Sequence, residues 1–199
     1  MRKWLAAMAA LVVITGAVLL GTGTVGRARY PRPYFDLVAQ ECAATGEDPA
    51  LVSAVIYHES RWDREAESSA GARGLMQLTE GTYQWLRSLE GLEEGDQDRL
   101  FDPEENIHYG CALLRLLLDR YDGRAETALA AYNAGLGNVG EWLQDAAYSD
   151  DGATLKEIPF PETAHYVEAV LATREKYRVL YEDSGDPVRD FFARMGAAF

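Results

Sequence analysis

One stretch of the sequence decides the fold class: DPALVSAVIYHES, residues 48–60. It opens with aspartate followed by proline, which is a typical N-cap and first position of a helix. Leu51, Val55 and Glu59 follow at spacings of four, so they share one face of that helix. The pattern predicts a helix over residues 50–60 whose apolar stripe, facing the core, ends in a glutamate.

Similar caps and helical periodicity recur along the chain, whereas convincing alternation of period two is absent. The expected helices cover residues 36–45, 50–60, 80–89, 103–121, 124–132 and 161–181. Loops are expected at 66–74 and 90–98, and a turn at the three glycines of 135–140. The predicted fold class is therefore mainly α, with no internal repeat.

Length and charge narrow the range of functions. The chain has 199 residues, with 19 Lys and Arg against 32 Asp and Glu, and a formal net charge of −13. One domain is the natural expectation at this length. A protein that neutralises nucleic-acid phosphates needs a basic patch, and no stretch interleaves Lys or Arg with aromatic residues. Nucleic acid is therefore excluded as a partner.

The N-terminal part predicts export from the cytoplasm. Residues 4–26 contain no charged side chain and follow Arg2 and Lys3. This run is long enough to cross a bilayer as a helix, so we expect an uncleaved membrane anchor, with a cleaved signal peptide as the alternative. Residues 27–33 form a connector, 34–181 the folded domain and 182–199 a tail without an assignment.

The two cysteines leave two interpretations open. Cys42 and Cys111 lie in a domain expected to be exported, where a disulfide would survive. Each cysteine also fits an apolar helical stripe, where buried free thiols are equally expected.

Two other motifs are deceptive. Residues 135–140, GLGNVG, match a dinucleotide-binding pattern, but that pattern needs a preceding strand and an Ala-rich helical segment precedes it here. His58-Glu59 begins like the zinc motif H-E-x-x-H, but Trp62 occupies the second histidine position. We expect neither a cofactor nor a bound metal.

Glu59 is the candidate for acid–base chemistry. The carboxy-terminal end of a helix and apolar neighbours both disfavour its ionised form, so its pKa is expected to be raised. A carboxyl that stays partly protonated near neutral pH is what a general acid requires. A second carboxylate in an apolar setting is missing nearby, since Glu65 and Glu67 belong to a polar loop. The second step then needs a nucleophile from the substrate itself.

Four motifs together resemble a known family. HES at residues 58–60, GLMQ at 74–77, AYNAG at 131–135, and IPFPET at 158–163 with HYV at 165–167 look like the motifs of the soluble-lytic-transglycosylase-type catalytic domain. That family has a lysozyme-like, mainly α fold and cleaves bacterial peptidoglycan. The resemblance implies that glycan strands of peptidoglycan are the substrate.

The resemblance also implies roles for single residues. Glu59 matches the sole catalytic acid/base, which protonates the glycosidic oxygen and then helps to form a 1,6-anhydro ring on the muramoyl unit. The positions that line the groove or hold Glu59 are Ser60, Ser68, Gln77, Tyr132, Asn133, Glu162 and Tyr166. In the functional interpretation of Tyr132, its hydroxyl bonds Glu59. Thr79 departs from the family, which commonly has methionine there.

Two alternatives differ from the transglycosylase interpretation. A muramidase on the same fold would use Glu65 or Glu67 to activate water. A non-catalytic wall-binding module would need no buried acid. Partner proteins leave no readable trace in the sequence.

Overall fold

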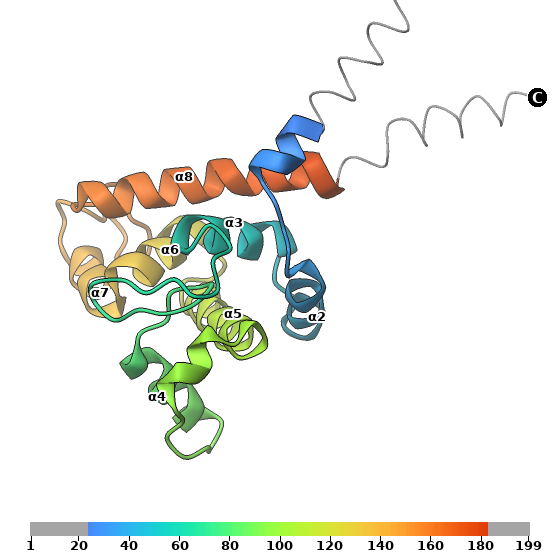
Figure 1. Cartoon of the computed structure of the whole chain (residues 1–199). Coiled ribbons are helices and arrows are strands. Elements are labelled where there is room, and N and C mark those ends of the chain that lie inside the picture. Colours follow the sequence, from blue (N-terminus) through green and yellow to red (C-terminus); the bar gives the residue numbers. More distant parts are fainter. Residues whose placement is uncertain (1–23, 183–199) are drawn as a thin grey trace, which may run out of the picture. The chain divides into compact units, whose positions relative to one another are not determined.

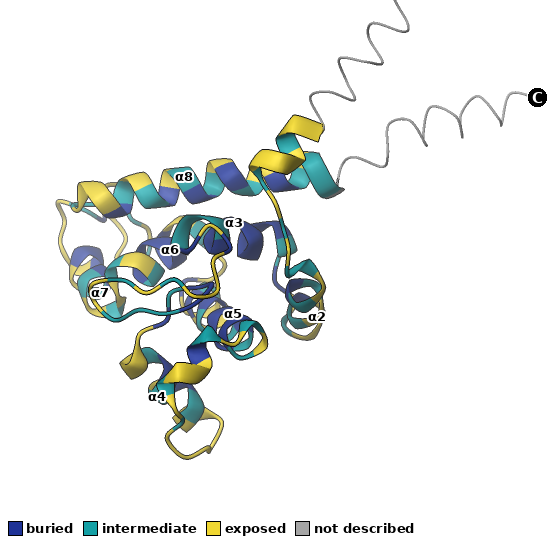
Figure 2. Ribbon diagram, in the orientation of Figure 1, coloured by how far each residue is buried: buried dark blue, intermediate teal, exposed yellow. Residues whose placement is uncertain are grey.

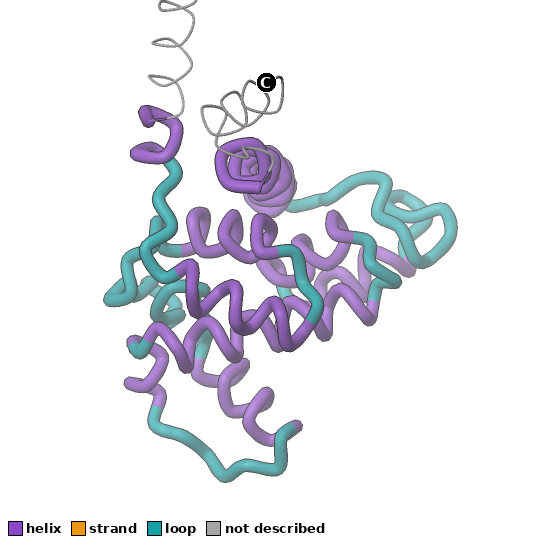
Figure 3. The backbone as a smooth tube through the Cα atoms, turned by 90° about the vertical axis from the view of Figure 1, so that its right-hand side faces the viewer, coloured by secondary structure: helices purple, strands orange, loops and turns teal. Residues whose placement is uncertain are grey.

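The structure is a computed structural model that describes residues 24–182, and helices dominate this part of the chain (Figures 1 and 3). Within these residues, pairing of the β type is confined to isolated bridges of Arg73 with Glu67 and with Leu78. The mainly α prediction is confirmed.

The helices follow one another with short connections. In chain order they are α2 (Phe35–Thr45), α3 (Pro49–Glu59), α4 (Glu80–Leu89), the 3₁₀ helix η1 (Gln97–Phe101), α5 (Pro103–Arg120), α6 (Ala125–Ala134), α7 (Leu136–Gln144), α8 (Pro161–Tyr177) and the π-helical η2 (Arg178–Glu182).

The helix starts follow local sequence signals. Asp48 and Asp102 are N-caps whose carboxylates accept backbone N–H bonds, each followed by proline in the first turn. Gly46 ends α2 in the left-handed conformation, with φ of 84°, which glycine adopts without a steric penalty. These boundaries agree with the expected ones within about two residues.

One expectation about local structure was wrong. The glycines of residues 135–140 do not form a simple turn: Gly135 separates two helices, and Gly137 and Gly140 lie inside α7. Helix α7 forms because Val139, Trp142 and Leu143 bury one face of it, which outweighs the weak helix propensity of glycine. The acidic loop ends close to its expected boundary, where η1 begins at Gln97. The last helix extends about as far as expected, and it changes from α to π geometry after Tyr177.

Helix α5 is the central element of the larger unit, because α2, α4, α6 and η1 all pack against it. Figure 2 shows buried residues gathered where these helices meet. One core cluster joins Leu78, Tyr83, Leu86, Leu100 and Tyr109. Because Leu78 belongs to this cluster, the end of the segment of residues 66–79 is packed into the core.

Backbone proximity divides the chain into two units. The larger unit is Arg32–Glu175, and the described part of the other combines residues 24–31 with residues 176–182. Within the second unit, the hydroxyl of Tyr177 donates to the Pro31 carbonyl and that of Tyr181 to the Tyr30 carbonyl, each at 2.8 Å.

The expected anchor at residues 4–26 and the tail at 182–199 lie almost wholly outside the described residues. Between residues 24 and 182, the structure contains no helix that is both long and apolar enough to span a membrane.

Candidate active site

Glu59 is the last residue of α3, a helix that is buried around its whole circumference. Residues 50–56 are all buried, and Ala54, Val55 and Ile56 have no exposed surface (Figure 2). The expected apolar stripe was therefore too narrow a description, since every face of α3 meets protein. The helix leads directly to Glu59, which is itself partly buried.

The carboxyl of Glu59 has one direct hydrogen-bond donor, the hydroxyl of Tyr166 on α8, 2.6 Å from Oε1. Burial raises the pKa of Glu59 from its ordinary 4.5 to about 7, and the Tyr166 bond lowers it only in part. Burial, together with the charge of Glu59, raises the pKa of Tyr166 well above its ordinary value. Tyr166 therefore remains a donor across the physiological pH range.

Tyr132 does not make the bond expected of it. Its hydroxyl donates to the backbone carbonyl of Met76 at 2.8 Å, so the tyrosine that bonds Glu59 is Tyr166 instead. Tyr132 is nevertheless close enough that the charge of Glu59, after burial, raises the pKa of its phenol. Its observed contact holds the segment of residues 74–77 rather than the acid.

Ser60 fastens the same segment to the end of α3. Its hydroxyl donates to the Leu75 carbonyl at 2.8 Å, and the side chain is buried. Since Ser60 directly follows Glu59, the segment of residues 74–77 is tied both to the acid-bearing helix through Ser60 and to α6 through Tyr132.

Gln77 connects this segment to the preceding loop. Its Nε2 donates to the carbonyls of Ala66 at 3.0 Å and Gly74 at 2.9 Å. Ser68 stabilises that loop, because its Oγ accepts the Ala72 N–H at 3.0 Å. Gln77 thus joins residues 74–77 to the loop that begins at residue 66, and Ser68 stabilises that loop from within.

Asn106 is a central residue that sequence reasoning missed. It has no exposed surface; Oδ1 accepts the Met76 N–H at 2.7 Å, and Nδ2 donates to the carbonyls of Arg73 and Leu100 at 2.9 and 2.8 Å. A Cβ at Gly74 would lie 2.3 Å from Nδ2 of Asn106, so glycine is required there. The sequence held no signal for the contacts with Met76 and Arg73, because they join residues 30 and 33 positions apart.

His58 was rejected as a zinc ligand and was given no role of its own within the HES motif, yet it anchors α3 next to the acid. Its Nε2 lies 2.8 Å from the Thr173 hydroxyl on α8. Burial and then the charge of Arg61 lower the pKa of His58, so the ring is neutral at physiological pH. Helix α8 therefore contacts the end of α3 through both His58 and Glu59.

Backbone strain is concentrated at this site. Arg61 and Trp62 adopt φ of 56° and 68°, and Gln77 adopts 49°, all in the left-handed region that side chains disfavour. Such residues persist only where the surrounding structure holds them, and they cluster at functional sites. Here Arg61 and Trp62 come shortly after the candidate acid in the chain, and Gln77 is the last residue of the segment of residues 74–77.

Asn133 and Glu162 lie at the surface. Asn133 Oδ1 accepts the Thr163 hydroxyl at 2.8 Å, which links the end of α6 to the first turn of α8. Glu162 occupies that first turn and is exposed. The structure brings Glu59, Ser60, Tyr132, Tyr166 and Gln77 into one connected cluster, whereas Asn133 and Glu162 lie outside its hydrogen bonds.

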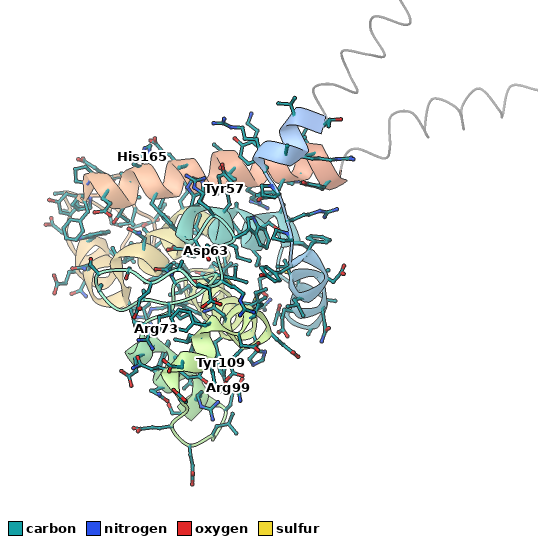
Figure 4. The ribbon with its side chains drawn as sticks, in the orientation of Figure 1. Tyr57, Asp63, Arg73, Arg99, Tyr109 and His165 are labelled. Carbon is teal, nitrogen blue, oxygen red and sulfur yellow. The ribbon has the colours of Figure 1, made fainter. Side chains whose placement is uncertain are left out.

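A separate cavity of about 560 Å³ does not include Glu59. Among its lining residues are Arg99 and Tyr109, which Figure 4 places by α4 and α5, away from Tyr57 on α3 and His165 on α8. Across residues 24–182, no group of three or more His, Cys, Asp or Glu is arranged to hold a metal ion.

Comparison with known proteins defines the class. Residues 36–154, more than half of the chain, match the family model described as the transglycosylase SLT domain. The chain belongs to this family, as its motifs predicted, and its fold is lysozyme-like.

Several members are clearly similar. The soluble lytic murein transglycosylase of Escherichia coli K12 is 35% identical over 159 residues, covering 78% of this chain and 24% of that protein. The crystal structure of the 70 kDa soluble lytic transglycosylase from Escherichia coli matches with a TM-score of 0.70 and 30% identity, over 79% of this chain and 26% of that one. For an inactive mutant of the Pseudomonas aeruginosa lytic transglycosylase Slt, in which glutamine replaces a glutamate, the TM-score is 0.68 and the identity 31%, over 77% of this chain and 25% of that one. The chain thus spans about a quarter of the length of these relatives.

Proposed function

We propose that this protein is a peptidoglycan lytic transglycosylase, a lyase acting on the β-1,4 bond between N-acetylmuramic acid and N-acetylglucosamine. The observation that carries the proposal is the buried carboxyl of Glu59, whose pKa of about 7 suits both giving and taking a proton. Membership of the SLT family and the names of the relatives support the substrate class. Residues 34–181 are proposed as the catalytic domain.

Glu59 serves as both acid and base in this proposal. Its protonated carboxyl gives a proton to the glycosidic oxygen, and the bond from that oxygen to the muramoyl C1 breaks. The substrate's own N-acetyl group stabilises the positive charge that develops at C1. The carboxylate of Glu59 then takes the proton of the C6 hydroxyl, whose oxygen bonds C1 and closes the 1,6-anhydro ring. Water is not consumed.

The other predicted residues have supporting roles. Tyr166 positions Glu59 and stabilises its carboxylate form. Ser60 and Tyr132 hold residues 74–77 in place through their backbone carbonyls. Ser68, Gln77, Asn133 and Glu162 are proposed to contact the glycan strand, which the exposure of Asn133 and Glu162 permits.

The position of Glu65 and Glu67 favours the lyase over the muramidase. A hydrolase needs a second carboxylate that activates water on the opposite face of the sugar. Glu65 is exposed and paired with Arg64 at 2.8 Å, and Glu67 is paired with Arg73 at 2.9 Å. These ion pairs leave Glu59 as the carboxyl best suited to the chemistry.

We also propose that the enzyme acts outside the cytoplasm, where peptidoglycan lies, held to the membrane through residues 4–26. The uncharged run in the sequence supports this location. Fractionation of cells that produce the full chain, followed by N-terminal sequencing of the purified protein, tests the anchor against a cleaved signal.

Mass spectrometry of the muropeptides released from purified peptidoglycan tests the reaction. The full-length wild type should release products with 1,6-anhydro ends, and Glu59→Gln should release none. Glu65→Gln and Glu67→Gln are matched controls, because each removes a carboxyl of the same loop region and should leave the products unchanged. Products with reducing ends from the wild type would identify a muramidase instead. If a folded wild type released no muropeptides, both the lyase and the muramidase interpretations would be contradicted.

A further inference from the structure

Two contacts fix how α2 faces α5. The Glu41 carboxylate lies 3.1 Å from Nδ1 of His108. One turn further along α2 and two turns further along α5, Nη1 of Arg115 donates to the Thr45 carbonyl at 2.9 Å. As α2 advances from residue 41 to 45, α5 advances from 108 to 115. The two helices therefore run side by side in the same direction, with a register set at both ends of this interval.

The two cysteines lie inside that interval. Cys42 follows Glu41 by one residue, and Cys111 lies one turn beyond His108 and one turn before Arg115. Both side chains are buried, with 4% and 0% exposure, both are free thiols, and Cys42 is close enough to raise the pKa of the Cys111 thiol. The chain has no other cysteine, so only one intramolecular pair can form.

We propose that Cys42 and Cys111 form a disulfide site, which closes to a covalent link between α2 and α5 under oxidising conditions. A disulfide needs two Cα atoms within about 7 Å and Cβ atoms that face each other. Cys42 lies on α2 and Cys111 on α5, two helices that pack against each other, and the register set by the Glu41 and Arg115 contacts places the two cysteines opposite one another. This inference stands independently of the proposed catalytic activity.

The oxidant can be a small disulfide such as oxidised glutathione. One cysteine thiolate attacks a glutathione sulfur, and the first glutathione leaves as a thiolate. The second cysteine then attacks the sulfur of the protein in that mixed disulfide, and the second glutathione leaves. Two protein thiols lose two electrons and two protons, and one glutathione disulfide becomes two glutathione thiols.

The surroundings determine when this reaction takes place. The neighbouring Cys42, burial and the charges of Glu47 and Glu41 raise the pKa of the Cys111 thiol. Glu47 contributes a side chain with only 1% exposure. A thiol with a raised pKa is a poor nucleophile, and glutathione cannot reach a buried one. The link therefore forms while α2 is still packing onto α5, not in the finished fold.

Oxidative refolding of the full-length chain tests the site. The reduced, unfolded protein is refolded with a mixture of reduced and oxidised glutathione, then alkylated in denaturant and weighed intact. The expected product carries no alkyl group and no glutathione, and is lighter than the reduced chain by two hydrogens. Two alkylated cysteines, or a persistent glutathione adduct, would overturn the proposal.

Thermal unfolding supplies a second measurement. The link closes a loop between positions 69 apart, so the oxidised form should melt on the order of 10 °C above the reduced form, and reductant should abolish the difference. The Cys42→Ala, Cys111→Ala double variant should melt at one temperature with or without reductant. Folded, reduced wild type placed in the same glutathione mixture should keep both thiols; rapid oxidation there would contradict the proposed order of events.

Discussion

Two partly buried glutamates show how the same side chain takes on opposite properties. Glu59 at the end of α3 and Glu105 in the first turn of α5 each accept a tyrosine hydroxyl at 2.6 Å, from Tyr166 and Tyr83 respectively. Glu105 also pairs with Arg99 at 2.8 Å and Arg87 at 3.5 Å. Among residues 24–182, Glu59 forms no ion pair.

The arginines account for the difference. Burial opposes ionisation of Glu105, but the hydrogen bonds and charges around it outweigh burial and lower its pKa. At Glu59 burial prevails over its single tyrosine bond, and the pKa rises to about 7. A tyrosine alone orients a carboxyl and keeps it able to exchange protons, whereas an added guanidinium fixes it as an ion. Within the described part of the chain, the lack of a paired cation at Glu59 is therefore what distinguishes the candidate site from Glu105.

The largest expected effect comes from replacing each glutamate by glutamine. Glu59→Gln should reduce the rate of anhydromuropeptide release by at least about 10²–10⁴-fold, because the proton donor is lost while the shape is kept. Glu105→Gln should keep the reaction but lower the free energy of unfolding by about 1–3 kcal/mol, because Arg87 and Arg99 lose a charged partner. Rates on purified peptidoglycan and urea unfolding of both variants measure the contrast. Equal loss of activity in the two variants would contradict it.

The second prediction concerns stability against pH. The pKa of Glu59 in the folded chain lies above its ordinary 4.5, so the folded state binds more protons than the unfolded state between pH 4.5 and about 7. The contribution of Glu59 to stability therefore falls as the pH rises through this window, by about 3 kcal/mol in all.

The Glu59→Gln variant cannot ionise and should escape this loss. Its free energy of unfolding relative to wild type should increase from the acidic to the neutral end of the window and then level off. Glu65→Gln, which changes an exposed carboxyl, is the control and should show no such trend. A constant difference between wild type and Glu59→Gln would mean that Glu59 titrates normally.

Tyr166→Phe should have an intermediate effect. The hydroxyl of Tyr166 lowers the pKa of Glu59, so its removal should raise that pKa, move the pH–rate profile to higher pH and slow the reaction by roughly tenfold. Tyr132→Phe is the matched control, because its hydroxyl bonds the Met76 carbonyl instead of Glu59. A larger shift of the pH–rate profile in Tyr132→Phe than in Tyr166→Phe would show that Tyr132, and not Tyr166, positions Glu59.

The sequence predicted the features that depend on local signals. Asp48 and Asp102, each followed by proline, placed two helix starts correctly, and the end position of Glu59 on an apolar helix predicted its raised pKa. Helix α7 was missed because its glycines suggested a turn, although Val139, Trp142 and Leu143 have helical spacing.

Contacts between distant residues could not be predicted in the same way. Tyr166 lies 107 positions from Glu59, and Asn106 lies 30 positions from Met76. Motif resemblance identified Tyr132 and Tyr166 as site residues, but only the packing of α8 on α3 decides which hydroxyl reaches the acid. Asn106 has its role because two turns of backbone converge on it, and no pattern of neighbouring residues encodes that convergence.

The smallest expected effect concerns His108. Unlike Glu59, an acid without a charged partner among the described residues, His108 is a base that lies between two acidic side chains. Its ring nitrogens lie 3.1 Å from Glu41 and 3.1 Å from Glu90, and Glu90 also accepts the Tyr109 hydroxyl. Burial lowers the pKa of His108, but the bonds and charges of Glu90 and Glu41 prevail and raise it above its ordinary 6.5. The stabilisation that the charged ring contributes to the fold is then fully present below pH 6.5, and it is lost as the pH rises through the pKa of His108 in the folded chain.

Because the side chain is 41% exposed, His108→Gln should lower the free energy of unfolding by no more than about 1 kcal/mol, and only on the acidic side of that pKa. Urea unfolding of wild type and variant on both sides of that pKa measures this, and a cost that grows with rising pH would show that the two carboxylates do not hold the ring as a cation.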